Sequence, residues 1–247
     1  MNILVCITKA PDTTAKIGFT DNNSALNEAG IQWIINPYDE WYALVRALEL
    51  KEAGIAQNLH LITVGKADVE PVIRKALALG GDEAIRIDGE SNDSYYIATQ
   101  IAAYANTQSY DLILTGKESI DYGNASIGAM VAELLDRPFI SHATKLDVES
   151  GRVIVNREME GGEETNSCTM PLVISCQKGM AEARIPNMRG IMAARTKPLK
   201  VVAAQDCDTL TQIVSYDLPT QKTGVKMIDA DNMDELVRLL HEEAKVI

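Results

Sequence analysis

Residues 110–135 read YDLILTGKESIDYGNASIGAMVAELL, a short apolar run followed by a polar loop and then a helical pattern. The run 112–114 lies between Asp111 and Gly116, which is typical of a buried parallel strand. In open α/β sheets, ligands bind where a loop leaves the carboxyl end of a strand, and the amides that begin the next helix favour an anion. The stretch therefore predicts a site for a nucleotide or another phosphate. The apolar positions of the expected helix are Ile127, Met130, Val131, Leu134 and Leu135.

Strand and helix patterns alternate before this stretch. Asn36 is suited to cap a helix, Pro37 to occupy its first position, and Gly54 to end it. Pro11 keeps residues 9–13 from being helical, so a loop is expected there. Such alternation predicts βαβ units and a Rossmann-like parallel sheet, hence an α/β fold. Strands are expected at 2–8, 59–64 and 83–87, and helices at about 36–54, 68–79 and 94–105.

The alternation of strand and helix patterns ends after Pro138. Strand patterns at 139–146 and 153–159 favour a hairpin, and with 172–176 they would add antiparallel strands to the sheet. Residues 178–200 carry six basic groups against the single acid Glu182. This basic segment, with a short helix near Ile191, could dock an acidic partner or could be a solvated loop.

Residues 204–230 are polar and irregular, and they lead to an amphipathic final helix. Asn232 and Glu235 have the spacing of a capping box at its start. A helix at the end of such an arm needs a surface to pack on, in this chain or in another. We therefore divide the chain into an α/β domain, 1–203, and a C-terminal arm, 204–247.

Composition excludes several functions. A net charge of −12 argues against nucleic acid or an anionic membrane as the main partner, and 5% aromatic residues argue against a base-stacking platform. No apolar run approaches the roughly 20 residues needed to span a bilayer. The start of the chain resembles a strand more than a signal peptide, and four scattered cysteines without a CxxC pair indicate neither a disulfide framework nor a zinc site. A cytoplasmic protein is expected.

No catalytic motif is present: the chain lacks GxSxG, HExxH, Walker A and GxGxxG patterns. Loop 116–128 could cradle a phosphate with its amides, or it could be an ordinary connection. The helix start at Asn36 could likewise touch a nucleotide or simply be well capped. Arg157 and Glu158, adjacent in a strand, could be a surface pair of little energetic value.

Five segments in this order and spacing resemble the β subunit of electron transfer flavoproteins, over nearly the whole chain. The resemblance implies a Rossmann-like sheet of the adenine nucleotide α-hydrolase type. It also implies an electron carrier without catalytic residues of its own, in a heterodimer whose α subunit holds most of the FAD, while the β subunit buries a structural AMP. The segments are VCITKAPDT (5–13), NPYDE (36–40), GKESID (116–121), VNREMEGG (155–162) and IMAARTKP (191–198).

The resemblance also assigns roles to residues. Segment 184–196 resembles the loop that captures partner dehydrogenases, with Arg184, Met188, Ile191 and Met192 as contacts. Met188 stands where the family usually has leucine, and methionine also suits an apolar pocket. Arg157 and Glu158 match a pair that contacts the flavin-bearing domain. The implied nucleotide contacts are Cys6, Ile7, Thr8, Asn36, Pro37, Tyr38, Asp39, Val64, Gly65, Asp121, Tyr122, Gly123, Asn124, Ala125, Ser126, Ile127, Gly128 and Met130.

Three functions remain to be distinguished, two within this family and one outside it. The first is an electron carrier that accepts electrons from acyl-CoA dehydrogenases and passes them to an electron transfer flavoprotein–quinone oxidoreductase or another acceptor. The second is a bifurcating complex with a second FAD in place of AMP. The third is a homodimeric nucleotide sensor similar to universal stress proteins. Family members of the first two kinds differ from this chain at Tyr122, Gly123, Ala125 and Ser126.

Overall fold

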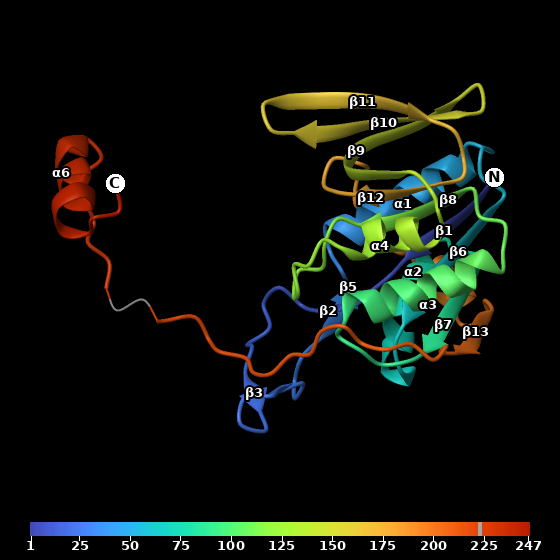
Figure 1. Ribbon diagram of the computed structural model, residues 1–247, viewed down its shortest axis with the longest axis horizontal. Coiled ribbons are helices and arrows are strands. Elements are labelled where there is room, and N and C mark those ends of the chain that lie inside the picture. The colour runs from blue at the N-terminus through green and yellow to red at the C-terminus, as the bar shows by residue number, and fades with distance from the viewer. Residues whose placement is uncertain (222–223) are drawn as a thin grey trace.

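A nine-stranded sheet runs through the body of the protein in the computed structural model, which describes residues 1–221 and 224–247 (Figure 1). The strands β9, β12, β8, β1, β6, β7 and β13 are neighbours in that order, and each is parallel to the next. Strands β10 and β11 extend the sheet beyond β9 as antiparallel strands. The expected α/β fold with antiparallel additions is confirmed, but residues 172–176, expected among the antiparallel strands, are parallel to both of their neighbours, and residues 162–168 form an antiparallel strand that was not expected. In spatial order the strands are β11 (Gly162–Cys168), β10 (Arg152–Met159), β9 (Phe139–Glu149), β12 (Leu172–Cys176), β8 (Leu112–Gly116), β1 (Asn2–Cys6), β6 (Asn58–Val64), β7 (Glu83–Asp88) and β13 (Leu199–Ala203).

Helices cover both faces of the sheet. On one face lie α1 (Asp39–Glu52) and α2 (Glu70–Leu79), which follows the 3₁₀ turn η1 (Ala67–Val69), and α5 (Met188–Ala194) packs on α2. On the other lie α3 (Ser94–Asn106) and α4 (Ile127–Leu134). The strands alternate between the two cores, so Ile3 and Val5 pack toward α1 while Leu4 packs toward α3. Both faces are therefore buried, as a parallel sheet requires.

The arm leaves the sheet after β13 and ends in α6 (Met233–Arg238), which continues as a π-helical turn, η2 (Leu239–Glu243). Figure 1 shows α6 standing apart from the sheet. The Asn232 side chain accepts a hydrogen bond from the Glu235 amide, so the expected cap is confirmed. No helix in the described part of the chain is long and apolar enough to cross a membrane.

Three local expectations were wrong or incomplete. Helix α1 begins at Asp39 with Tyr38 in the capping position, so Asn36 is not its cap. Residues expected as a loop include β2 (Lys9–Pro11), which pairs with β5 (Trp33–Ile35). Strand β13 was not expected at all, because it is short and half exposed and lies at the sheet edge. A second small ladder joins β3 (Phe19–Thr20) to β4 (Ala25–Leu26).

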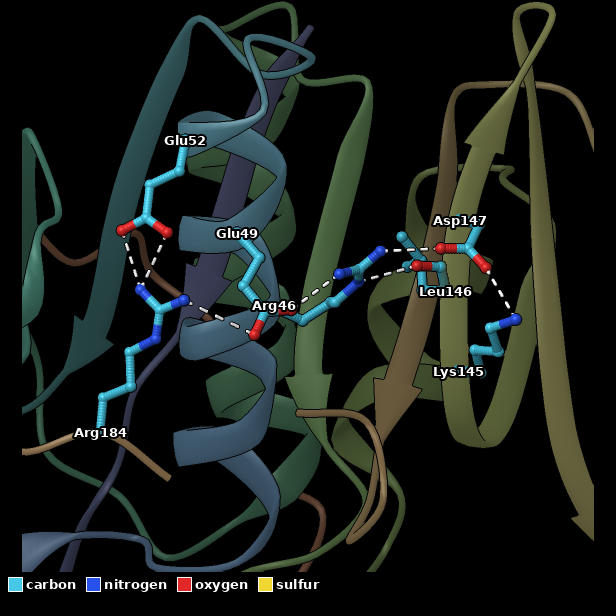
Figure 2. Close-up of polar contacts among 7 residues, drawn as sticks. All are labelled: Arg46, Glu49, Glu52, Lys145, Leu146, Asp147 and Arg184. Atoms are coloured by element: carbon cyan, nitrogen blue, oxygen red, sulfur yellow. Dashed lines mark hydrogen bonds and ion pairs between the residues drawn. The ribbon is translucent and has the colours of Figure 1, made fainter. Parts of the chain in front are cut away.

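Arg46 links α1 to the antiparallel end of the sheet (Figure 2). Its guanidinium donates to the Leu146 carbonyl at 2.8 Å and pairs with Asp147 at 2.9 Å, both in β9. On the same helix Glu49 accepts from Arg46 and also lies 3.6 Å from Arg184, whose guanidinium pairs with Glu52 at 2.8 Å as well. Helix α1 therefore joins segment 184–196 to the hairpin through charged side chains.

Arg46→Ala is expected to lower the free energy of unfolding by about 1–2 kcal/mol, because it removes a half-buried charged donor to β9. Lys145→Ala is the matched control: Lys145 also pairs with Asp147, at 3.2 Å, but it is 66% exposed and should cost less than about 0.5 kcal/mol. Chemical denaturation measures both. Equal effects would contradict the role given to Arg46.

Candidate functional site

A cavity of about 410 Å³ opens at the carboxyl ends of β1, β6 and β8. From β1 the chain passes through α1 to β6 on one side, and from β7 it passes through α3 to β8 on the other side of β1. The strand order therefore reverses between β1 and β8, which is where open α/β sheets bind ligands. Cavities that bind small molecules span roughly 300–1,000 Å³, so this one is small but sufficient.

Loops that are distant in sequence supply the walls. Of the expected nucleotide contacts, those after β1, after β6 and before α4 line the cavity together. The loop before α4 thus lies beside the start of the chain in space. The expected residues on the cavity wall are Cys6, Ile7, Thr8, Val64, Gly65, Asp121, Tyr122, Asn124, Ala125, Ser126 and Ile127.

The other expected contacts lie behind this wall or beside it. Gly128 faces β8, where an added Cβ would lie 2.7 Å from Thr115 Oγ1, so glycine lets α4 begin close to the sheet. Met130 packs against the core beneath α4. Pro37 and Tyr38 precede α1, and Tyr38 is 54% exposed. The expected residues that do not line the cavity are Asn36, Pro37, Tyr38, Asp39, Gly123, Gly128 and Met130.

Asn36 and Asp39 hold the loop that follows β8. The buried Asn36 amide donates to the Glu118 carbonyl at 2.8 Å and accepts from the Ile120 amide at 3.3 Å. Asp39 accepts from the Glu118 amide at 3.1 Å. The segment expected to touch the ligand thus positions the loop that lines the cavity.

Asn36→Ala is expected to lower the free energy of unfolding by about 1–2 kcal/mol, because the buried Asn36 side chain loses its hydrogen bonds to the backbone of Glu118 and Ile120. Hydrogen exchange should accelerate at the Ile120 amide more than at amides of β8. Pro37→Ala is the control, since proline donates no backbone hydrogen bond. Unchanged exchange at Ile120 in Asn36→Ala would contradict this role.

Glu40 lines the cavity, although it is not among the expected nucleotide contacts. Its carboxyl accepts from the Thr8 amide at 2.5 Å and is almost wholly buried. Burial raises the pKa of Glu40 from 4.5 to about 8, against the Thr8 hydrogen bonds and with help from Asp121 and Asp39. Below that pH the carboxyl is neutral, and it can donate a hydrogen bond as well as accept one.

The lysines of the cavity do not bind an anion strongly. These lysines, Lys9, Lys66 and Lys117, each lie beside an acid in the chain. Donors for a phosphate come instead from the start of α4, where the first backbone bond within the turn runs from Met130 to Ser126. The Ser126 side chain does not cap the helix, which leaves its hydroxyl for a ligand. The donor set suits one phosphate better than a chain of them.

Thr115 and Tyr216 are among the other wall residues that were not expected. Thr115, at the end of β8, has a buried hydroxyl with no hydrogen-bond partner among the described residues. Tyr216 reaches the cavity from the arm. No sequence signal near Tyr216 indicates this, because its place depends on the path of an irregular segment. Both side chains leave polar atoms near the ligand space.

The expected partner contacts lie outside the cavity. On α5, Met188 is 73% exposed and Met192 55% exposed, with Ile191 beside them. Arg184 is held by Glu52 and Glu49 within the chain (Figure 2). The Trp41 indole donates to the Arg184 carbonyl. The result is an exposed apolar helix on an anchored segment.

Arg157 and Glu158 lie on β10, in the antiparallel part of the sheet. Arg157 lies 3.6 Å from Glu164 on β11, and its buried Nε has no partner among the described residues. The Glu158 carboxylate accepts a hydrogen bond from the side-chain amide of Gln177 at 2.6 Å. Neither Arg157 nor Glu158 lines the cavity.

Comparison with known proteins gives a consistent result over the whole chain. A family model described as an electron transfer flavoprotein domain matches residues 24–207. Electron transfer flavoprotein subunit beta of Bacillus subtilis is 36% identical over 100% of both chains. The same-named protein of Syntrophomonas wolfei is 35% identical over 93% of this chain and 90% of its own, and the mitochondrial subunit beta of Arabidopsis thaliana is 31% identical over 100% of both.

Proposed function

The chain belongs to the electron transfer flavoprotein family as a subunit beta, and from this premise we propose that its cavity holds a structural adenine mononucleotide. Family membership implies an α subunit as partner and electron transfer by flavin in the heterodimer. The alternative of a homodimeric nucleotide sensor is therefore set aside. The proposal concerns the ligand of this chain and the proteins with which the complex exchanges electrons.

One observation carries the choice of ligand: three separate segments that the family resemblance implicates, 6–8, 64–65 and 121–127, converge on one cavity at the strand-order reversal. Its volume of about 410 Å³ favours a mononucleotide over the much larger FAD. The amides at the start of α4 and the free Ser126 hydroxyl would hold one phosphate. Val64 and Gly65 at the end of β6, with Cys6 at the end of β1, would flank the base.

The nucleotide would stabilise the fold and take no electrons. When bound to the heterodimer, FAD supplies the redox chemistry, and this chain contributes binding surfaces. We propose that Met188, Ile191 and Met192 on α5, with Arg184, meet an acyl-CoA type dehydrogenase as donor. Arg157 and Glu158 would face the flavin-bearing part of the α subunit, and a quinone oxidoreductase would be the acceptor. On this proposal the chain is a cytoplasmic electron carrier subunit and not a catalyst.

Mass spectrometry of the small molecules released on denaturing the purified αβ complex tests the ligand. We expect one AMP and one FAD per heterodimer. Two FADs would replace this proposal with the bifurcating type, and FAD without any nucleotide in this chain would overturn a structural role for AMP. Flavin reduction by an acyl-CoA dehydrogenase, followed in the visible spectrum, tests the electron donor.

A further inference from the structure

The first part of the arm is tied to the body of the protein, although it forms no helix or strand. Gln100 in α3 is buried, donates to the Gln205 carbonyl at 3.0 Å and accepts from the Gln205 amide at 2.7 Å. This reciprocal pair fixes the arm directly after β13. It uses both groups of the buried Gln100 side chain, so the attachment leaves no polar atom of that amide unpaired.

A second attachment lies six residues further along. The buried Asp93 carboxylate accepts from the Thr211 amide at 2.9 Å and from the Thr211 hydroxyl at 2.5 Å. Asp93 also caps α3 by accepting from the Tyr96 amide at 2.7 Å. Burial opposes ionisation, but these hydrogen bonds outweigh it and hold the pKa of Asp93 below its usual range. Hydrogen bonds to a buried charge are strong, so this is a firm tether.

The third attachment is at the cavity itself. The Tyr216 amide donates to the Asn23 carbonyl at 2.7 Å, and its ring stacks on Phe19 with centroids 4.9 Å apart. Tyr216 also lines the cavity, where its side chain interacts with that of Tyr122 in the loop before α4. Burial, and next the neighbouring Tyr216, raises the pKa of Tyr122, so the Tyr122 phenol stays neutral beside the Tyr216 ring.

Beyond this point the arm leaves the body. Leu218 is 61% exposed, and α6 stands apart from the sheet (Figure 1). Tyr216 is thus the last residue of the tied part and also a wall of the cavity. A ligand in the cavity and the arm outside it share this one side chain.

We propose that residues 205–216 form a strap that retains the cavity ligand, with Tyr216 as a binding residue supplied by the arm. This inference rests on the proposed adenine mononucleotide. A ligand leaves when the Tyr216 ring moves away from Phe19 and Tyr122, and that movement is restrained upstream by Thr211. Weakening a tether that is remote from the ligand should therefore speed its release, which a residue acting only as a local wall would not do.

The test uses the αβ heterodimer loaded with radiolabelled AMP and diluted into excess unlabelled AMP. Tyr216→Ala should release AMP at least about tenfold faster, because it removes an aromatic wall. Thr211→Val keeps the side-chain shape but loses the hydroxyl donor to Asp93, and it should release AMP roughly three- to tenfold faster. Leu218→Ala, two residues beyond the tied part, is the matched control and should release AMP at the wild-type rate.

Each outcome either supports or contradicts the strap. Flavin absorbance and sedimentation of each variant report that the heterodimer is intact. Faster release from both Tyr216→Ala and Thr211→Val supports the strap. Equal release from all proteins overturns the strap while leaving AMP binding intact, and a fast Tyr216→Ala beside a wild-type Thr211→Val also overturns it. Wild-type heterodimer that binds no AMP overturns the proposed function, and the strap with it.

Discussion

Gly190→Ala is expected to displace α5 and to lower the rate of electron uptake from a partner dehydrogenase by at least about tenfold. An added Cβ at Gly190 would lie 2.2 Å from the carbonyl oxygen of Ala78, near the end of α2. A backbone atom cannot rotate away as a flexible side chain can, so α5 itself must move. Met188 and Met192 would move with it, and overpacking of this kind costs about 1–3 kcal/mol.

Stopped-flow reduction of the heterodimer flavin by the dehydrogenase measures this effect, as kcat/KM. The flavin and AMP contents should stay unchanged, because α5 lies outside the cavity. Gly162→Ala is the control, since an added Cβ there meets no heavy atom within 4 Å. A wild-type reduction rate in Gly190→Ala would show that α5 is not the docking helix.

Glu40→Gln is expected to flatten the pH dependence of stability. The pKa of Glu40 is about 8 in the fold, mainly because the carboxyl is buried, against 4.5 when it is exposed. The native state therefore keeps a proton that the unfolded chain has lost. The stabilisation is fully present below about pH 4.5 and is lost as the pH rises to about 8. A shift of this size corresponds to at most about 5 kcal/mol.

Thermal unfolding of the wild-type and Glu40→Gln heterodimers between pH 5 and 9 measures the difference. Glutamine can still accept from the Thr8 amide, so the hydrogen bond is retained while the titration is removed. As the pH rises from 5 to 8, the melting temperature of the wild type should fall relative to that of the variant. A constant gap across this range would show that Glu40 is ionised in the native state.

The fold was largely predictable because its signals are local. The run 112–114 and the helical spacing from Ile127 to Leu135 depend only on neighbouring residues, and they identified β8 and α4. Asn36 failed as a predicted cap for the opposite reason. Its amide binds Glu118 and Ile120, more than eighty residues away in sequence, and no local pattern reveals such partners.

The site was predictable in position but not in composition. Parallel strands bring their carboxyl ends together, so the loops after β1, β6 and β8 had to meet. Glu40 and Tyr216 were missed because their roles come from burial and from the path of the arm. An acid in the first turn of a helix usually faces solvent, and only the close approach of α1 to Thr8 makes Glu40 part of the wall.

The free length of the arm has a consequence for assembly. Residues 217–232 separate Tyr216 from the first residue of α6, a span of at most about 55 Å when fully extended. A partner already in contact with the sheet would meet α6 as a tethered ligand, at an effective concentration on the order of millimolar. Even weak intrinsic affinity of α6 for that partner would then suffice for near-complete occupancy. Lengthening the segment would lower this avidity gradually, while cutting it would remove the advantage at once.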